Sequence, residues 1–150
     1  MTRLEPPNDW IKRLGKEVEN RTKHLVTVRE KAPETLKQLQ RIVDRDAYRL
    51  NDELYESSGV IEVESVDVEA FNFAVEHTRR NVRVEVALDV KNDRLNITFN
   101  PSHQSEQFQC VVDNLGGLSF FENRSLVKLD EISRRILEPI VRAEFNLDAR

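Results

Sequence analysis

Residues 82–90 read VRVEVALDV, and this stretch decides the fold class. Apolar side chains occupy every second position, and charged or small side chains occupy the positions between them. Because successive side chains of a β-strand point to opposite faces of a sheet, the alternation predicts a strand with one buried and one hydrated face. Such strands are typical of antiparallel sheets, which can leave one face open to water.

Other short segments on both sides of this strand alternate in the same way. The clearest are residues 61–63, 71–75, 95–99 and 108–112. Asn92-Asp93 is predicted to form a two-residue hairpin turn, and residues 114–117 (NLGG) are predicted to form another turn. We therefore expect an antiparallel sheet of five to six strands over residues 60–122.

Helical periodicity flanks the predicted sheet. Upstream, a loose leader over residues 1–8 precedes a helical arm over residues 9–56, where apolar residues recur every three or four positions. Pro33 cannot donate a helix hydrogen bond, so we expect a break near Lys31-Ala32 and a second helix from Pro33, with one kinked helix as the alternative. Downstream, residues 130–145 are predicted to form a C-terminal helix capped by Asp130.

The predicted order is helices, then consecutive hairpins, then a final helix. This order is typical of an α+β protein. The length of 150 residues suits one domain with a helical appendage. We therefore expect a helical arm over residues 9–56 and an α+β sheet domain over residues 57–150, which together form one folded unit.

Charge and hydropathy exclude several classes of partner. The chain carries 23 basic and 27 acidic side chains, a net charge of −4, and nucleic-acid binding relies on clustered Lys and Arg. No run of apolar residues approaches the length of a membrane span, and the first ten residues contain no apolar signal segment. The sequence therefore favours a cytoplasmic protein that binds neither nucleic acid nor membrane.

Metal and cofactor sites are not expected. The histidines, His24, His77 and His103, lack the spacing of a helical metal site, and no cysteine pair is present. The single Cys110 lies in an apolar strand-like run, which predicts a small buried hydrophobe rather than a nucleophile. No glycine-rich loop has the spacing of a phosphate-binding motif.

Four side chains are weak candidates for catalysis: Glu62, Glu64, His77 and His103. Glu62 and Glu64 share one face of the first strand and could raise each other's pKa as an acid–base pair, although a hydrated sheet face explains them more simply. His77 continues the alternation of residues 71–75, which predicts a histidine at the rim of the core. A pocket between the sheet and the helices would add Tyr55 to this set.

A narrow apolar stripe with heptad-like spacing marks the first part of the helical arm. Its candidate self-association residues are Trp10, Leu14, Val18, Leu25 and Val28, and Arg21 fills one slot. An isolated helix with so narrow a stripe is marginal in water, and a second copy of the chain would bury it. The leading hypothesis is therefore a non-enzymatic binding or assembly protein that forms a homodimer.

Two alternatives remain open. One is a small-ligand-binding protein or hydrolytic enzyme with a pocket between the sheet and the helices. The other is a chaperone for a secreted or aggregation-prone protein client, which would suit a small acidic protein with an exposed sheet.

Overall fold

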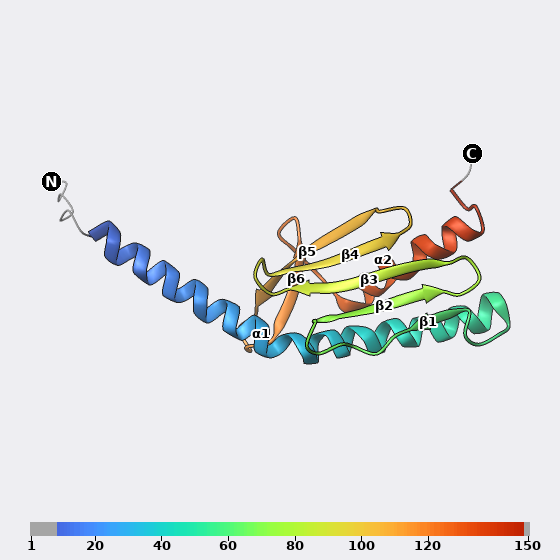
Figure 1. Cartoon of the computed structure of the whole chain (residues 1–150), viewed down its shortest axis with the longest axis horizontal. Helices are drawn as coiled ribbons and strands as arrows, with labels where there is room; N and C mark the ends of the chain where they lie inside the picture. The colour runs from blue at the N-terminus through green and yellow to red at the C-terminus, as the bar shows by residue number, and fades with distance from the viewer. Residues whose placement is uncertain (1–8, 149–150) are drawn as a thin grey trace.

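The computed structural model describes residues 9–148, so the leader predicted for residues 1–8 lies outside the described part of the chain. Within that part, a seven-stranded antiparallel sheet packs one face against a long N-terminal helix and a C-terminal helix (Figure 1). The predicted α+β class is therefore confirmed.

The strands follow one another as a simple meander in which each pairs with the next. In chain order they are β1 (Ile61–Val63), β2 (Asn72–His77), β3 (Val82–Asp89), β4 (Arg94–Asn100), β5 (Ser105–Val112), β6 (Leu118–Glu122) and β7 (Ser125–Val127). The sheet has one strand more than the upper end of the five to six predicted. The extra strand is β7, which follows a tight turn at Asn123 and Arg124, where both residues have positive φ.

The N-terminal helix α1 (Asp9–Leu50) is continuous over 42 residues and ends in a short π-helical turn, η1 (Asn51–Tyr55). The break predicted near Lys31-Ala32 is wrong, and the alternative of one kinked helix is what the structure shows. Ala32 and Leu36, on either side of Pro33, are completely buried, so packing against the sheet holds both halves in one helix. Figure 1 shows the axis of α1 changing direction where it reaches the sheet, as expected near an internal proline.

Two local predictions need correction. Asn92-Asp93 is not a two-residue turn, because Asp89 pairs with Arg94 and leaves residues 90–93 between the strands. Asp93 adopts a positive φ, and its carbonyl accepts a hydrogen bond from the backbone N–H of Cys110 at 2.8 Å, which binds the turn to β5.

The C-terminal helix α2 (Leu129–Glu144) begins one residue before the predicted Asp130 cap. Lys128 occupies the cap position, and its side chain makes no capping hydrogen bond.

The hydrophobic core lies between the sheet and the two helices. The alternation of residues 82–90 works as predicted, since Val84, Val86 and Leu88 are buried on the inner face. Phe108 and Phe120 fill the centre of the core with at most 1% of their surface exposed. This face of the sheet is thus closed by packing, and the exposed features of the molecule lie elsewhere.

Candidate functional site

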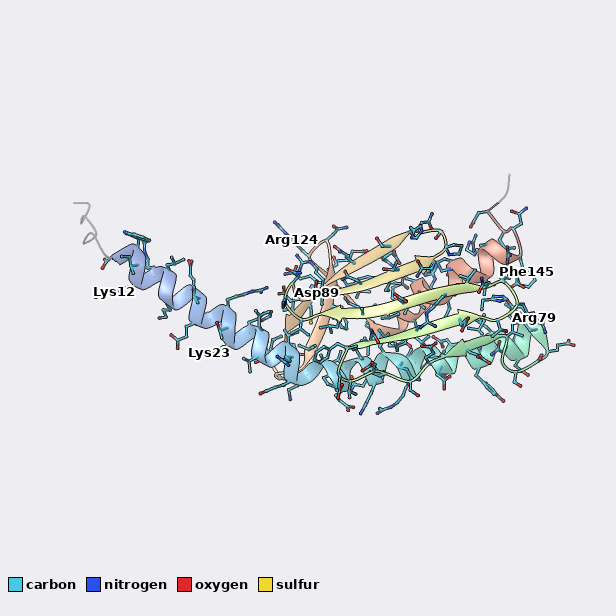
Figure 2. The ribbon with its side chains drawn as sticks, viewed as in Figure 1. Lys12, Lys23, Arg79, Asp89, Arg124 and Phe145 are labelled. Atoms are coloured by element: carbon cyan, nitrogen blue, oxygen red, sulfur yellow. The ribbon has the colours of Figure 1, made fainter. Side chains whose placement is uncertain are left out.

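The first turns of α1 extend beyond the sheet, as Figures 1 and 2 show. We call residues 9–20 the N-terminal arm. Its large apolar side chains are about half exposed: Trp10 58%, Ile11 53%, Leu14 49% and Val18 59%. Most other side chains of the arm are polar, and Lys12 and Lys16 are exposed.

The apolar stripe of the arm continues the face of α1 that packs in the core. Eighteen residues make five full helical turns, so residues 18 apart lie on the same side of the helix. The exposed residues Trp10, Leu14 and Val18 thus align with Val28, Ala32 and Leu36, which are completely buried. Among the predicted self-association residues, Val28 lies inside the chain's own core and Leu25 is half-buried, whereas the other three are exposed.

A cluster of polar side chains marks the point where α1 first meets the sheet. Arg21 donates hydrogen bonds to both carboxylate oxygens of Asp93, at 2.9 and 3.0 Å, and His24 Nε2 lies 3.0 Å from the same carboxylate. The hydrogen bond from Arg21 outweighs burial, so the pKa of Asp93 is lowered. The only hint of this junction in the sequence is Arg21, which interrupts an otherwise apolar stripe.

The four weak catalytic candidates do not converge. Glu62, on β1, faces Glu76 across the strand pair, whereas Glu64 forms an ion pair with Arg83 at 2.6 Å. The hydrogen bond from Arg83 lowers the pKa of Glu64, which is opposite to what a general acid requires. His103 lies exposed in the turn between β4 and β5.

His77 is completely buried, and it joins three elements of the fold. Its Nε2 lies 2.6 Å from a carboxylate oxygen of Glu144 on α2, and the Tyr55 hydroxyl donates to the same carboxylate. Burial raises the pKa of Tyr55, and its hydrogen bond to Glu144 adds to the effect. The cluster therefore fastens η1 and α2 to β2.

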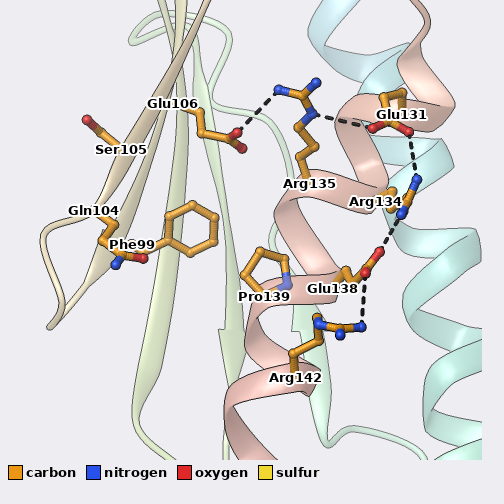
Figure 3. Close-up of a pocket in the computed structure, with 10 residues that line it drawn as sticks. All are labelled: Phe99, Gln104, Ser105, Glu106, Glu131, Arg134, Arg135, Glu138, Pro139 and Arg142. Atoms are coloured by element: carbon orange, nitrogen blue, oxygen red, sulfur yellow. Dashed lines mark hydrogen bonds and ion pairs between the residues drawn. The ribbon is translucent and has the colours of Figure 1, made fainter. Parts of the chain in front are cut away.

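A groove of about 560 Å³ lies between α2 and the ends of β4 and β5 (Figure 3). Its apolar wall contains Phe99 and Pro139. Three arginines of α2 line the groove, and each is already bonded to a carboxylate of the same chain: Arg134 to Glu138 at 2.6 Å, Arg135 to Glu106 at 3.3 Å and Arg142 to Glu138 at 3.4 Å. Three glutamates balance the three arginines along this wall, so the groove offers an incoming anion no uncompensated charge.

Cys110 is completely buried, and burial raises the pKa of its thiol to about 12. Within residues 9–148, no group of three or more His, Cys, Asp or Glu side chains is arranged to hold a metal ion. None of the helices described there combines the length and apolar character that a membrane-spanning helix requires. The arm brings four large exposed apolar side chains together within three helical turns, namely Trp10, Ile11, Leu14 and Val18.

Comparison of the chain with models of protein families, with curated proteins and with solved structures finds no match.

Proposed function

We propose that this chain is a non-enzymatic binding or assembly protein that forms a homodimer through its N-terminal arm. The observation that carries the proposal is the continuity of one apolar face along α1, which the sheet covers from Val28 onward and leaves exposed at Trp10, Leu14 and Val18. A helix face of this kind is stable in water when a second apolar surface covers it.

The energetics favour a reversible dimer. Burying the exposed half of an Ile, Leu or Val side chain contributes on the order of 1 kcal/mol, and the larger Trp10 contributes roughly twice that. Two arms together then supply roughly 10 kcal/mol before the cost of association, which is at least about 4 kcal/mol. At this lower value of the cost, the net gain of about 6 kcal/mol corresponds to a dissociation constant of tens of micromolar.

Sedimentation equilibrium from about 1 to about 200 µM tests the proposal, because this range brackets the expected constant. The diagnostic change is Val18→Gln, and its matched control is Val26→Gln. The two valines are similarly exposed, at 59% and 50%, but Val26 is turned about 80° away from Val18 around the helix and lies outside the stripe.

The first substitution should weaken the dimer about tenfold or more, whereas the control should leave the association constant unchanged. A wild-type chain that remains monomeric throughout this range refutes the proposal, and so do equal effects of the two substitutions.

The two alternatives make different demands on the structure. A small-ligand or hydrolytic function needs converging polar groups in a pocket, and the groove along α2 contains arginines whose charges are already compensated. A chaperone could use the same arm stripe to hold an aggregation-prone client. That function would give a monomer that suppresses client aggregation, and Val18→Gln would remove the effect.

A further inference from the structure

We propose that the two arms pair in antiparallel orientation, with Leu14 of each copy packed against the partner's Val18. This inference rests on the proposed function and specifies the geometry of the same interface. It places the two-fold axis beside residue 16 and the two sheets at opposite ends of the dimer.

The position of the sheet argues for antiparallel arms. From Val28 onward, the space in front of the stripe is taken by the chain's own core, and Val28 itself is completely buried. In a parallel pair, the partner's α1 would have to continue into that space. In an antiparallel pair, the first residue of the partner's stripe that forms a layer, Ile11, would lie opposite Arg21, seven residues before Val28.

The spacing of the stripe selects the register. Ile11, Leu14, Val18, Arg21 and Leu25 follow the alternating steps of three and four that form layers between two helices. With Leu14 on the partner's Val18, the next layer places Ile11 against the partner's Arg21. The charge of Arg21 is already compensated by Asp93, so this layer introduces no unpaired cation.

A deeper register is blocked by the fold. Sliding the arms together by one further heptad would place Ile11 against the partner's Val28, which has no exposed surface. The proposed register is therefore the one that buries the most of both arms.

Gly15 fits the same arrangement. A glycine within a helix costs about 1 kcal/mol relative to alanine, and a Cβ at Gly15 would meet nothing within 4 Å in the single chain. Beside the proposed axis, Gly15 of each copy would face its counterpart, where the missing side chains allow close approach.

Glu17 of each copy would also face its counterpart, so Glu17→Gln should tighten an antiparallel dimer by removing a like-charge contact.

Spin labels on the outer side of the first part of α1 can report the orientation directly. Lys12, Lys16 and Lys23 are exposed and lie within about 40° of one another around the helix, facing away from the stripe. Each is replaced singly by Cys in the full-length chain and labelled. Cys110, the single native cysteine, is completely buried, and the unsubstituted chain serves as the control for background labelling.

Pulsed dipolar spectroscopy then measures the distance between the two labels of each dimer. At a rise of 1.5 Å per residue, an axis beside residue 16 separates the paired labels along the helix by about 0 Å at position 16, about 12 Å at position 12 and about 21 Å at position 23. The expected result is the shortest distance at position 16 and the longest at position 23.

Equal distances at the three positions would show parallel arms and overturn this inference while leaving the arm-mediated dimer intact. A dimer that is weakened by Val18→Gln but has its shortest distance at another position would overturn the proposed register. An unlabelled chain that stays monomeric would remove the proposed function itself, so the two failures are distinguishable.

Discussion

Replacing Asn51 by Ala should destabilise the fold by removing the contact that holds the edge strand β1 against α1. Asn51 is only 7% exposed, and its side-chain amide bonds to both backbone groups of Ile61. The Nδ2 group donates to the Ile61 carbonyl at 3.0 Å, and the Ile61 N–H donates to Oδ1 at 2.9 Å. The Asn51 side chain thus bonds to the backbone groups on the outer side of the edge strand β1, where no further strand pairs with them.

The expected magnitude follows from these two hydrogen bonds. Alanine leaves the N–H and C=O of Ile61 without partners in a buried setting, where each unsatisfied group costs about 1–3 kcal/mol. We therefore expect the free energy of unfolding to fall by about 2–4 kcal/mol, since some water reaches the edge of the sheet. The measurement is urea unfolding followed by circular dichroism, with the m-value compared to detect changes in the unfolded state.

Asn92→Ala is the matched control. Asn92 is exposed and bonds to Asp89 at 2.8 Å within a turn, so the same substitution there should cost less than about 1 kcal/mol. If the two variants lose the same free energy of unfolding, the role assigned to the Asn51 amide is refuted.

Three further predictions follow from single sites. Cys110 should react with a thiol reagent at about pH 8 far more slowly in the native protein than in urea, because its thiol is buried and has a raised pKa. Rapid reaction of the folded chain would show that the core does not enclose Cys110. The pKa of Asp93 is lowered, so its contribution to stability is present above the ordinary aspartate pKa and is lost as the pH falls through the folded-state value. Asp93→Asn should therefore flatten the acid dependence of the urea midpoint between about pH 5 and pH 2, and an unchanged slope would exclude Asp93 as its source. Pro33→Ala restores a backbone donor inside α1, and it should raise the free energy of unfolding by about 1–2 kcal/mol. The gain is less than the full cost of a helix proline because the core is packed around the bend. A melting temperature below that of the wild type would show that the bend itself is needed for packing.

Features that depend on local periodicity were predictable from the sequence. The alternation in residues 82–90 correctly identified β3 and its buried face, because a strand with one dry side must repeat every second residue. The break predicted at Pro33 is wrong because the rule concerns an isolated helix, and here Ala32 and Leu36, on either side of the proline, are buried in the core. Tertiary packing outweighed the local cost.

Contacts between residues distant in sequence were not predictable. Glu144 lies 67 positions from His77, and no pattern in the chain links the two. The turn before β4 was also misjudged, because Asp93 is held by Arg21 on α1, 72 positions away. The candidate site was predicted only in part: the apolar stripe was visible in the sequence, but its exposed and buried portions looked alike.

The exposed and buried portions of the stripe look alike in the sequence because the boundary between them depends on the length of the sheet. The same helical face runs from Trp10 past Leu36, and its spacing does not change where the sheet begins. Arg21 is the one polar residue in the stripe, and it lies where α1 first meets the sheet. Its charge is compensated there by Asp93, at the end of the β3–β4 turn. The exposed part of the stripe is therefore set by how far the β-turns reach along α1, a property of the folded sheet, and not by the helix sequence itself.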